Sequence, residues 1–164
     1  MTEKAAPLVR EADLADAADA AAIVAVLDSY ASDPRGGGEP LSQQVRATLV
    51  PKLRAHPARL VLLAFDAGQA VGLLTGFWGL SSFKAQPLLN VHDLAVVPGH
   101  RGRGTGRALL TAAESLACAR GCCRLTLEVQ DDNTPARRLY ERFGFRDVRY
   151  GDSGPTRFLA KPLD

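Results

Sequence analysis

The sequence has little of what metal-binding and exported proteins carry. Its 164 residues include three cysteines, Cys118, Cys122 and Cys123. No second cysteine pair stands at the spacing of a zinc site, so we expect no metal. An odd number of cysteines without an export signal is typical of reduced thiols. The segment Met1–Arg10 lacks the apolar stretch that export requires, so we predict a cytoplasmic protein.

Long apolar runs and a large excess of charge are missing too. No run of about 20 apolar residues occurs, so we expect no membrane span and no membrane partner. The 20 basic and 18 acidic residues leave a formal net charge of +2, which gives no reason to expect nucleic acid as a partner. The hydrophobic content of 46% indicates a globular protein, and the length fits a single domain over residues 1–164.

Hydrophobic periodicity predicts the order of secondary structure. Helical spacing favours four helices, over 13–30, 41–56, 104–120 and 134–144. We expect Thr134 to be the N-cap of the last helix and Gly144 to end it. Alternating or continuous apolar runs favour about seven strands, over 8–11, 59–65, 70–80, 88–97, 124–130, 145–150 and 156–160, the last two as a hairpin. Between the first two helices, Ser32–Pro40 is rich in glycine and proline. We expect it to be a mobile surface loop, either a simple connector or a wall of a substrate cleft.

The predicted order of elements defines the fold class. The strand 88–97, the helix 104–120 and the strand 124–130 form a crossover unit, which makes these two strands parallel. The remaining connections are hairpins, so the other strands are antiparallel. We therefore predict an α/β (α+β) fold whose mixed, mostly antiparallel sheet has a central parallel pair and flanking helices.

A glycine-rich turn is predicted between the strand 88–97 and the next helix. The segment His100–Arg107 reads HRGRGTGR. Backbone N–H groups at such a turn, with the first turn of the helix, attract an anion, and glycine lets it approach closely. Arg101, Arg103 and Arg107 add positive charge. The pattern indicates a phosphate site, but it has neither the Lys-Ser/Thr ending of a P-loop nor the glycine spacing of a dinucleotide site.

Three motifs together resemble the GNAT superfamily of N-acetyltransferases. The family's cofactor motif, Arg/Gln-x-x-Gly-x-Gly/Ala, is filled by Arg101, Gly104 and Gly106. Its strand ending in Leu-x-Val is matched by Leu94, Ala95 and Val96. Its later Asn-x-x-Ala…Leu-Tyr-x-x-x-Gly-Phe is matched by Asn133, Ala136, Leu139, Tyr140, Gly144 and Phe145. These matches lie between residues 88 and 146.

The resemblance implies the GNAT fold and direct acetyl transfer from acetyl-CoA to an amine, with no metal. The strand of Leu94, Ala95 and Val96 would separate from its parallel neighbour after a bulge, and the pantetheine arm would pair with it. Asn133 would hydrogen-bond the same arm. The pyrophosphate would bind the backbone N–H groups of Gly102, Arg103, Gly104, Thr105, Gly106 and Arg107.

The proton transfers of such a reaction need an acid and a base. Tyr140 would lie beside the sulfur and protonate the leaving thiolate. Three residues are candidates for the base: Glu128 first, because a glutamate in a matching Leu-Glu-Val context serves ribosomal-protein N-terminal acetyltransferases, then Asp93 and His92. A bound water is the alternative. Successive strand residues face opposite sides, so His92 and Asp93 share a face only if a bulge redirects one of them.

The acceptor is not readable from these residues. A small amine and a protein N-terminus both remain open, as does a homodimer. A second interpretation keeps the fold without the chemistry, as a non-catalytic module that senses acetyl-CoA.

Overall fold

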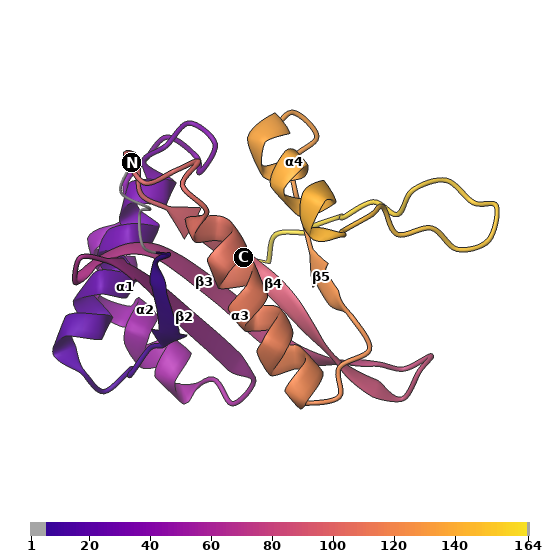
Figure 1. Cartoon of the computed structure of the whole chain (residues 1–164), viewed down its shortest axis with the longest axis horizontal. Coiled ribbons are helices and arrows are strands. Elements are labelled where there is room, and N and C mark those ends of the chain that lie inside the picture. Colours follow the sequence, from indigo (N-terminus) through magenta and orange to yellow (C-terminus); the bar gives the residue numbers. More distant parts are fainter. Residues whose placement is uncertain (1–5, 164) are drawn as a thin grey trace. The chain divides into compact units, whose positions relative to one another are not determined.

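The computed structural model describes residues 6–163, which form two compact units (Figure 1). The first unit ends at Leu127 and the second begins at Glu128. The first holds β1 (Leu8–Glu11), α1 (Ala17–Ala31), α2 (Gln43–Ala55), β2 (Arg59–Asp66), β3 (Gln69–Ser81), β4 (Gln86–Val96), α3 (Thr105–Ala119) and β5 (Leu125–Leu127). The second holds α4 (Thr134–Phe143). None of the helices within residues 6–163 is long and apolar enough to cross a membrane.

The sheet of the first unit is mixed and has the strand order β1-β2-β3-β4-β5. The pairs β1–β2, β2–β3 and β3–β4 are antiparallel, and the pair β4–β5 is parallel. The predicted parallel pair is therefore present, with α3 as its crossover, but it lies at the edge of the described sheet and not at its centre. The structure has five strands in this sheet where the sequence predicted about seven.

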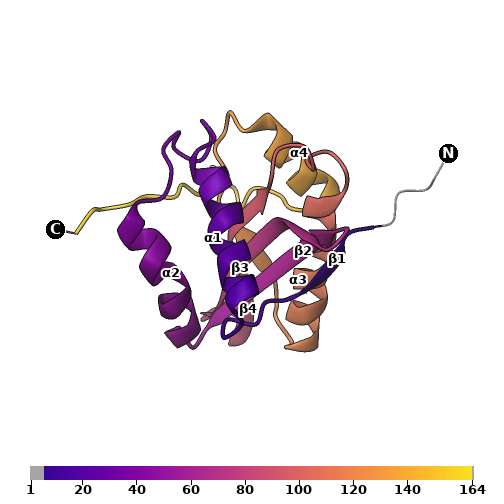
Figure 2. The ribbon, with the colours of Figure 1, turned by 90° about the vertical axis from the view of Figure 1, so that its left-hand side faces the viewer.

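Helices cover both faces of the sheet in the first unit. Figure 2 shows α1 and α2 against one face and α3 against the other. The first face buries Ile23 and Val26 of α1 with Leu63 and Leu73 of the sheet. Because both faces are covered, β2 is buried at every position from Leu60 to Ala64 and reads as a continuous apolar run.

The segment between α1 and α2 forms a turn that is closed by its own hydrogen bonds, and its mobility stays a prediction. The Asp33 carbonyl accepts from Gly36 N at 2.8 Å and from Gly38 N at 3.0 Å. Asp33 Oδ1 accepts from Arg35 N at 3.0 Å. A Cβ on Gly36 would stand 1.9 Å from the Tyr30 carbonyl oxygen, so only glycine fits this turn.

Within residues 128–163, the second unit contains one helix, α4, which is capped at both ends. Asn133, and not Thr134 as predicted, is the N-cap of α4, and its side chain accepts from Ala136 N at 3.3 Å. Pro135 then stands inside the first turn, where a missing N–H costs nothing. Gly144 ends the helix in the left-handed region, with φ of 112°, as predicted.

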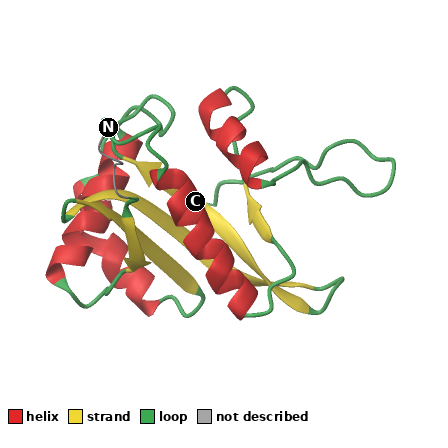
Figure 3. Cartoon of the chain, viewed as in Figure 1, coloured by secondary structure: helices red, strands yellow, loops and turns green. Residues whose placement is uncertain are grey.

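The predicted final hairpin is not formed as strands among the described residues, and Figure 3 draws this part as loop. One backbone contact crosses it, from Thr156 N to the Val148 carbonyl at 3.0 Å. Every residue from 146 to 163 is exposed. A hairpin that packs no apolar face is marginal in water, which explains why alternation alone overestimated the sheet.

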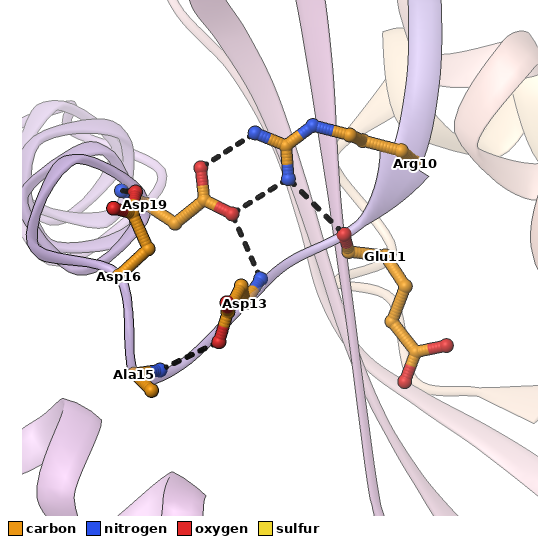
Figure 4. Close-up of polar contacts among 6 residues, drawn as sticks. All are labelled: Arg10, Glu11, Asp13, Ala15, Asp16 and Asp19. Carbon is orange, nitrogen blue, oxygen red and sulfur yellow. Dashed lines mark hydrogen bonds and ion pairs between the residues drawn. The ribbon is translucent and has the colours of Figure 1, made fainter.

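A buried carboxylate joins the edge strand β1 to α1 (Figure 4). Asp19, which is 3% exposed, accepts from Arg10 Nη1 and Nη2 at 2.6 and 2.7 Å and from Asp13 N at 2.8 Å. The Arg10 guanidinium also lies 4.7 Å from the ring centroid of Phe65. These hydrogen bonds, those from Arg10 above all, hold the pKa of Asp19 below its ordinary value.

We expect Asp19→Asn to lower the free energy of unfolding at pH 7 by roughly 2 kcal/mol, because one side of a charge-assisted pair is lost. Since the pKa of Asp19 is depressed by folding, its contribution is present above the unfolded-chain value of about 4 and disappears as the pH falls through the folded value. Urea unfolding between pH 7 and pH 2 measures both effects. The exposed Glu11→Gln is the control and should change little. Equal stability of Asp19→Asn and the parent protein would contradict this account.

Candidate functional site

A β-bulge in β4 redirects two of the predicted site residues. Thr75 of β3 pairs with Asp93, but the next residue, Gly76, pairs with Val91. His92 is therefore the extra residue of the bulge. The bulge that the family resemblance implied is present.

The bulge brings His92 and Asp93 to the same face of the sheet, the face that α1 and α2 cover. Asp93 Oδ2 accepts a hydrogen bond from Thr75 Oγ1, its partner on the neighbouring strand. Because side chains alternate along β3, Thr75 lies on the same face as Leu73. The His92 ring lies 5.5 Å from the ring of Phe77, which packs against the core of that face. Without the bulge, alternation would have sent one of the two side chains to the opposite face.

Pairing between the parallel strands ends where the bulge begins. The ladder between β4 and β5 joins Leu89–Val91 to Leu125–Leu127 and stops there. Beyond it, residues 93–96 of β4 pair with β3 alone among the strands described. Leu94, Ala95 and Val96 thus form part of a strand with one open edge in this unit, whose backbone groups could pair with a ligand.

The turn that follows β4 has the geometry of an anion site. Gly99, Gly102 and Gly104 have positive φ values of 57°, 71° and 87°. Gly104 is the N-cap of α3 and offers no side chain to the first N–H groups of the helix. Nothing lies within 4 Å of where a Cβ on Gly102 or Gly104 would be, so a ligand can approach the backbone. These features fit a diphosphate, whose charge the helix dipole also favours.

The three arginines of the turn differ in their partners. Arg101 donates from Nε to the Val96 carbonyl at 2.9 Å and from Nη1 to Asp33 Oδ2 at 2.8 Å. Arg35 N and the Arg101 guanidinium together hold the pKa of Asp33 below its ordinary value. Arg103 and Arg107 instead line a groove of about 1060 Å³ between β1 and α3. Arg101 therefore fastens the turn to the segment between α1 and α2.

Thr105 and Gly106 begin α3, whose first turn lies directly on the sheet. Thr105 is 3% exposed. A Cβ on Gly72 of β3 would stand 2.9 Å from Thr105 Cγ2 and 3.0 Å from Leu109 Cδ1. A glycine on the strand thus lets the N-terminus of the helix approach and fixes the position of the turn.

Three site features were not anticipated from the sequence. Thr75 is buried and holds Asp93, and Asp33 holds Arg101. His56, at the end of α2, lies 4.8 Å from the Phe77 ring, on which His92 also packs. These contacts join segments far apart in the chain. A predicted pairing of the two strands could have indicated Thr75 as the neighbour of Asp93, but no sequence signal indicated the other two.

The remaining predicted residues lie in the second unit. The Asn133 side chain caps α4, and the Tyr140 ring packs 5.8 Å from the ring of Phe145. Glu128 is the first residue of this unit and is exposed. The structure thus groups His92 and Asp93 with the glycine turn in one unit, while the roles of Glu128, Asn133 and Tyr140 stay predictions.

The cysteines do not form a metal or disulfide site in the described part of the chain. Cys118, Cys122 and Cys123 are free thiols. Burial raises the pKa of the Cys122 thiol, and the neighbouring Cys123 raises it further. The raised pKa favours the protonated thiol. Within residues 6–163, no group of three or more metal-ligating side chains is close enough together to hold an ion.

Comparison with known proteins identifies the family. The sequence model of the Acetyltransferase (GNAT) family matches residues 23–145, so the chain belongs to this family. It is 43% identical to streptothricin acetyltransferase of Streptomyces lavendulae over 81 residues, which are 49% of this chain and 43% of that protein. It is 32% identical to the uncharacterized N-acetyltransferase YhfO of Bacillus subtilis (strain 168) over 133 residues, 81% of this chain and 87% of that protein.

Solved structures agree on the fold. One described as a probable acetyltransferase has a TM-score of 0.77 and 18% identity, and the match covers 94% of this chain and 99% of that one. The mixed α/β architecture of five strands and four helices is therefore that of GNAT proteins.

We expect Gly72→Ala to lower the free energy of unfolding by about 1–3 kcal/mol, because the added methyl group overlaps the first turn of α3. Denaturant unfolding measures this, and Gly79→Ala is the matched control. Gly79 lies on the same strand but is exposed, and its nearest neighbour is the end of the flexible Leu88 side chain. If both substitutions have the same effect, the close approach at Gly72 does not hold the helix in place.

Proposed function

We propose that this protein transfers an acetyl group from acetyl-CoA directly to a primary amine. The observation that carries the proposal is the turn after β4, where two left-handed glycines precede an α3 N-terminus without a side-chain cap. A diphosphate is the group that such a turn fits best. Acetyl-CoA carries a diphosphate and supplies a thioester as the acyl donor.

The open edge of β4 supports the same proposal. It runs from the turn back to the bulge, and from Val96 to His92 the strand rises by roughly 13 Å. The backbone of Leu94, Ala95 and Val96 would bind the arm of the cofactor along this edge. The N–H groups from Gly102 to Arg107 would hold its diphosphate.

Side chains of this protein would donate and accept the protons of the reaction. Tyr140 would donate a proton to the departing thiolate, and Asn133 would orient the cofactor arm. Glu128 is our first assignment for the base that receives the amine proton, with Asp93 and His92 as alternatives. The two alternatives gain support from the bulge, which places both on one face.

A small amine is the acceptor that we favour. The relative from Streptomyces lavendulae is named for streptothricin, and the chain matches less than half of that protein's length, 43%. The name of this relative supports small-molecule acetylation, and a protein N-terminus is the alternative acceptor.

The proposal predicts amine-dependent release of coenzyme A thiol from acetyl-CoA across a panel of small amines. Gly104→Ala should raise the Kd for coenzyme A at least tenfold, because the methyl group strains the turn and blocks the diphosphate. Gly121→Ala is the control, because Gly121 has a similar φ of 69° at the other end of α3. Binding of coenzyme A without turnover of any amine would favour the sensing module. No binding at all would overturn the proposal.

The proton-transfer roles predict that loss of Tyr140 changes kcat but not the KM for acetyl-CoA. Tyr140→Phe should lower kcat at least tenfold and leave the KM for acetyl-CoA within a few-fold, since the hydroxyl acts on the leaving group. Glu128→Gln should remove the limb of the pH–rate profile that reports the base. Tyr30→Phe, in α1, controls for loss of a hydroxyl. Unchanged turnover in Tyr140→Phe would exclude this residue from the chemistry.

A further inference from the structure

We propose that a second copy of this chain docks on the outer face of α1 and α2, so that the protein forms a two-fold dimer through these helices. This face is turned away from the sheet, whereas the anion turn and the open edge of β4 belong to other parts of the unit. The proposal therefore does not rest on the proposed acetyl transfer.

The first observation is an apolar groove of about 1110 Å³ between α1 and α2. Figure 2 shows the two helices side by side on one face of the sheet. Ile23 and Val26 of α1 face the core, and the groove lies on the other side of the helix pair. Open apolar grooves of this kind mark interaction sites. Its lining includes Leu14, Val24 and Ala25 on the α1 side and Ala47, Pro51 and Ala55 on the α2 side.

The second observation is that the two helices carry opposite charges at one end of the groove. The charged residues of α2 are all basic, namely Arg46, Lys52 and Arg54. The turn into α1 is acidic instead, and Asp13 and Asp16 are exposed there, as Lys52 and Arg54 are at the end of α2. Within residues 6–163, neither Lys52 nor Arg54 forms an ion pair. Each helix thus lacks the counter-charges that the other one carries.

The directions of the helices determine how a second copy can supply these charges. Asp28 near the end of α1 pairs with Arg46 near the start of α2 at 2.9 Å, so the helices run antiparallel and the start of α1 lies beside the end of α2. A two-fold axis parallel to the helices places α1 of one copy across α2 of the other. The acidic start of α1 then faces the basic end of α2 in the second copy, and symmetry makes this contact twice.

The size of the face sets the expected affinity. The two helices have 15 and 13 residues. Each is therefore about 20 Å long and about 10 Å across, which gives a face of roughly 400 Å² per copy. This area is below the ~800 Å² per partner of a standard interface. We therefore expect a dimer with a micromolar Kd, which salt weakens because its orientation depends on exposed charges.

The test measures the mass of the full chain by sedimentation equilibrium, over about 5 to about 200 µM protein at pH 7. We expect the mass to rise with concentration from the monomer value of 17.5 kDa toward twice that value. Raising NaCl from about 50 to about 500 mM should raise Kd several-fold. Ala25→Arg fills the middle of the groove and should raise Kd at least tenfold. Ala119→Arg is the matched control, because Ala119 is an exposed alanine of α3, on the opposite face of the sheet.

An exchange of charges tests the orientation of the two copies. Arg54→Glu and Asp13→Lys each bring like charges together in a homodimer, so each variant alone should be monomeric where the parent protein is dimeric. An equimolar mixture of the two variants should dimerise, because every such contact in the mixed dimer joins opposite charges. Glu114→Lys reverses an exposed charge of α3 and should leave Kd unchanged.

A parent chain that stays monomeric over the whole concentration range overturns the proposal. A dimer that Ala25→Arg leaves intact, or that Ala119→Arg weakens equally, also overturns it, because the groove is then not the interface. If the parent dimerises and the mixed variants do not, the proposed orientation is wrong. Recovery of the dimer in the mixture supports the proposal and shows that both variants are folded.

Discussion

The position of the α3 N-terminus on the sheet is the constraint on which the site depends. Gly72 of β3 leaves room for Thr105 and Leu109, so the first turn of the helix lies directly on the strand. The preceding turn therefore joins the end of β4 to a helix start that is packed against the sheet. Backbone groups fixed in this way can bind an anion without first losing conformational freedom.

The bulge at His92 is the second feature on which the site depends, because the strand pairing of β4 changes there. Up to Val91 the strand is paired on both sides, and after the bulge it is paired with β3 alone among the described strands. The same extra residue turns His92 and Asp93 to a common face. One local irregularity therefore both opens an edge and gathers side chains beside it, which matches the general placement of bulges near functional sites.

Much of this could be predicted from the sequence, because it depends on local chemistry. The helices from Ala17 to Ala31 and from Thr105 to Ala119, and the glycine turn between β4 and α3, follow from periodicity and from glycine. The sequence did not reveal the Thr75–Asp93 hydrogen bond or the Arg101–Asp33 pair, because each depends on pairing between distant segments. The prediction of the final hairpin was wrong, although the residues do alternate in hydrophobicity. Residues 146–163 bury no apolar face that would stabilise the strands. The N-cap of α4 was misplaced by one residue because Asn133 and Thr134 are both good caps.

The pairing of Arg101 with Asp33 makes two segments that are 68 residues apart in sequence depend on each other. The loop after α1 cannot be exchanged freely for one from a relative, because the incoming loop must provide an acid for the arginine of the turn. A chimera that lacks this acid removes the ion pair of Arg101 and keeps its hydrogen bond to the Val96 carbonyl. Loop diversity in this lineage is therefore expected to be accompanied by compensating changes at Arg101, or to conserve an acidic side chain at the start of the loop.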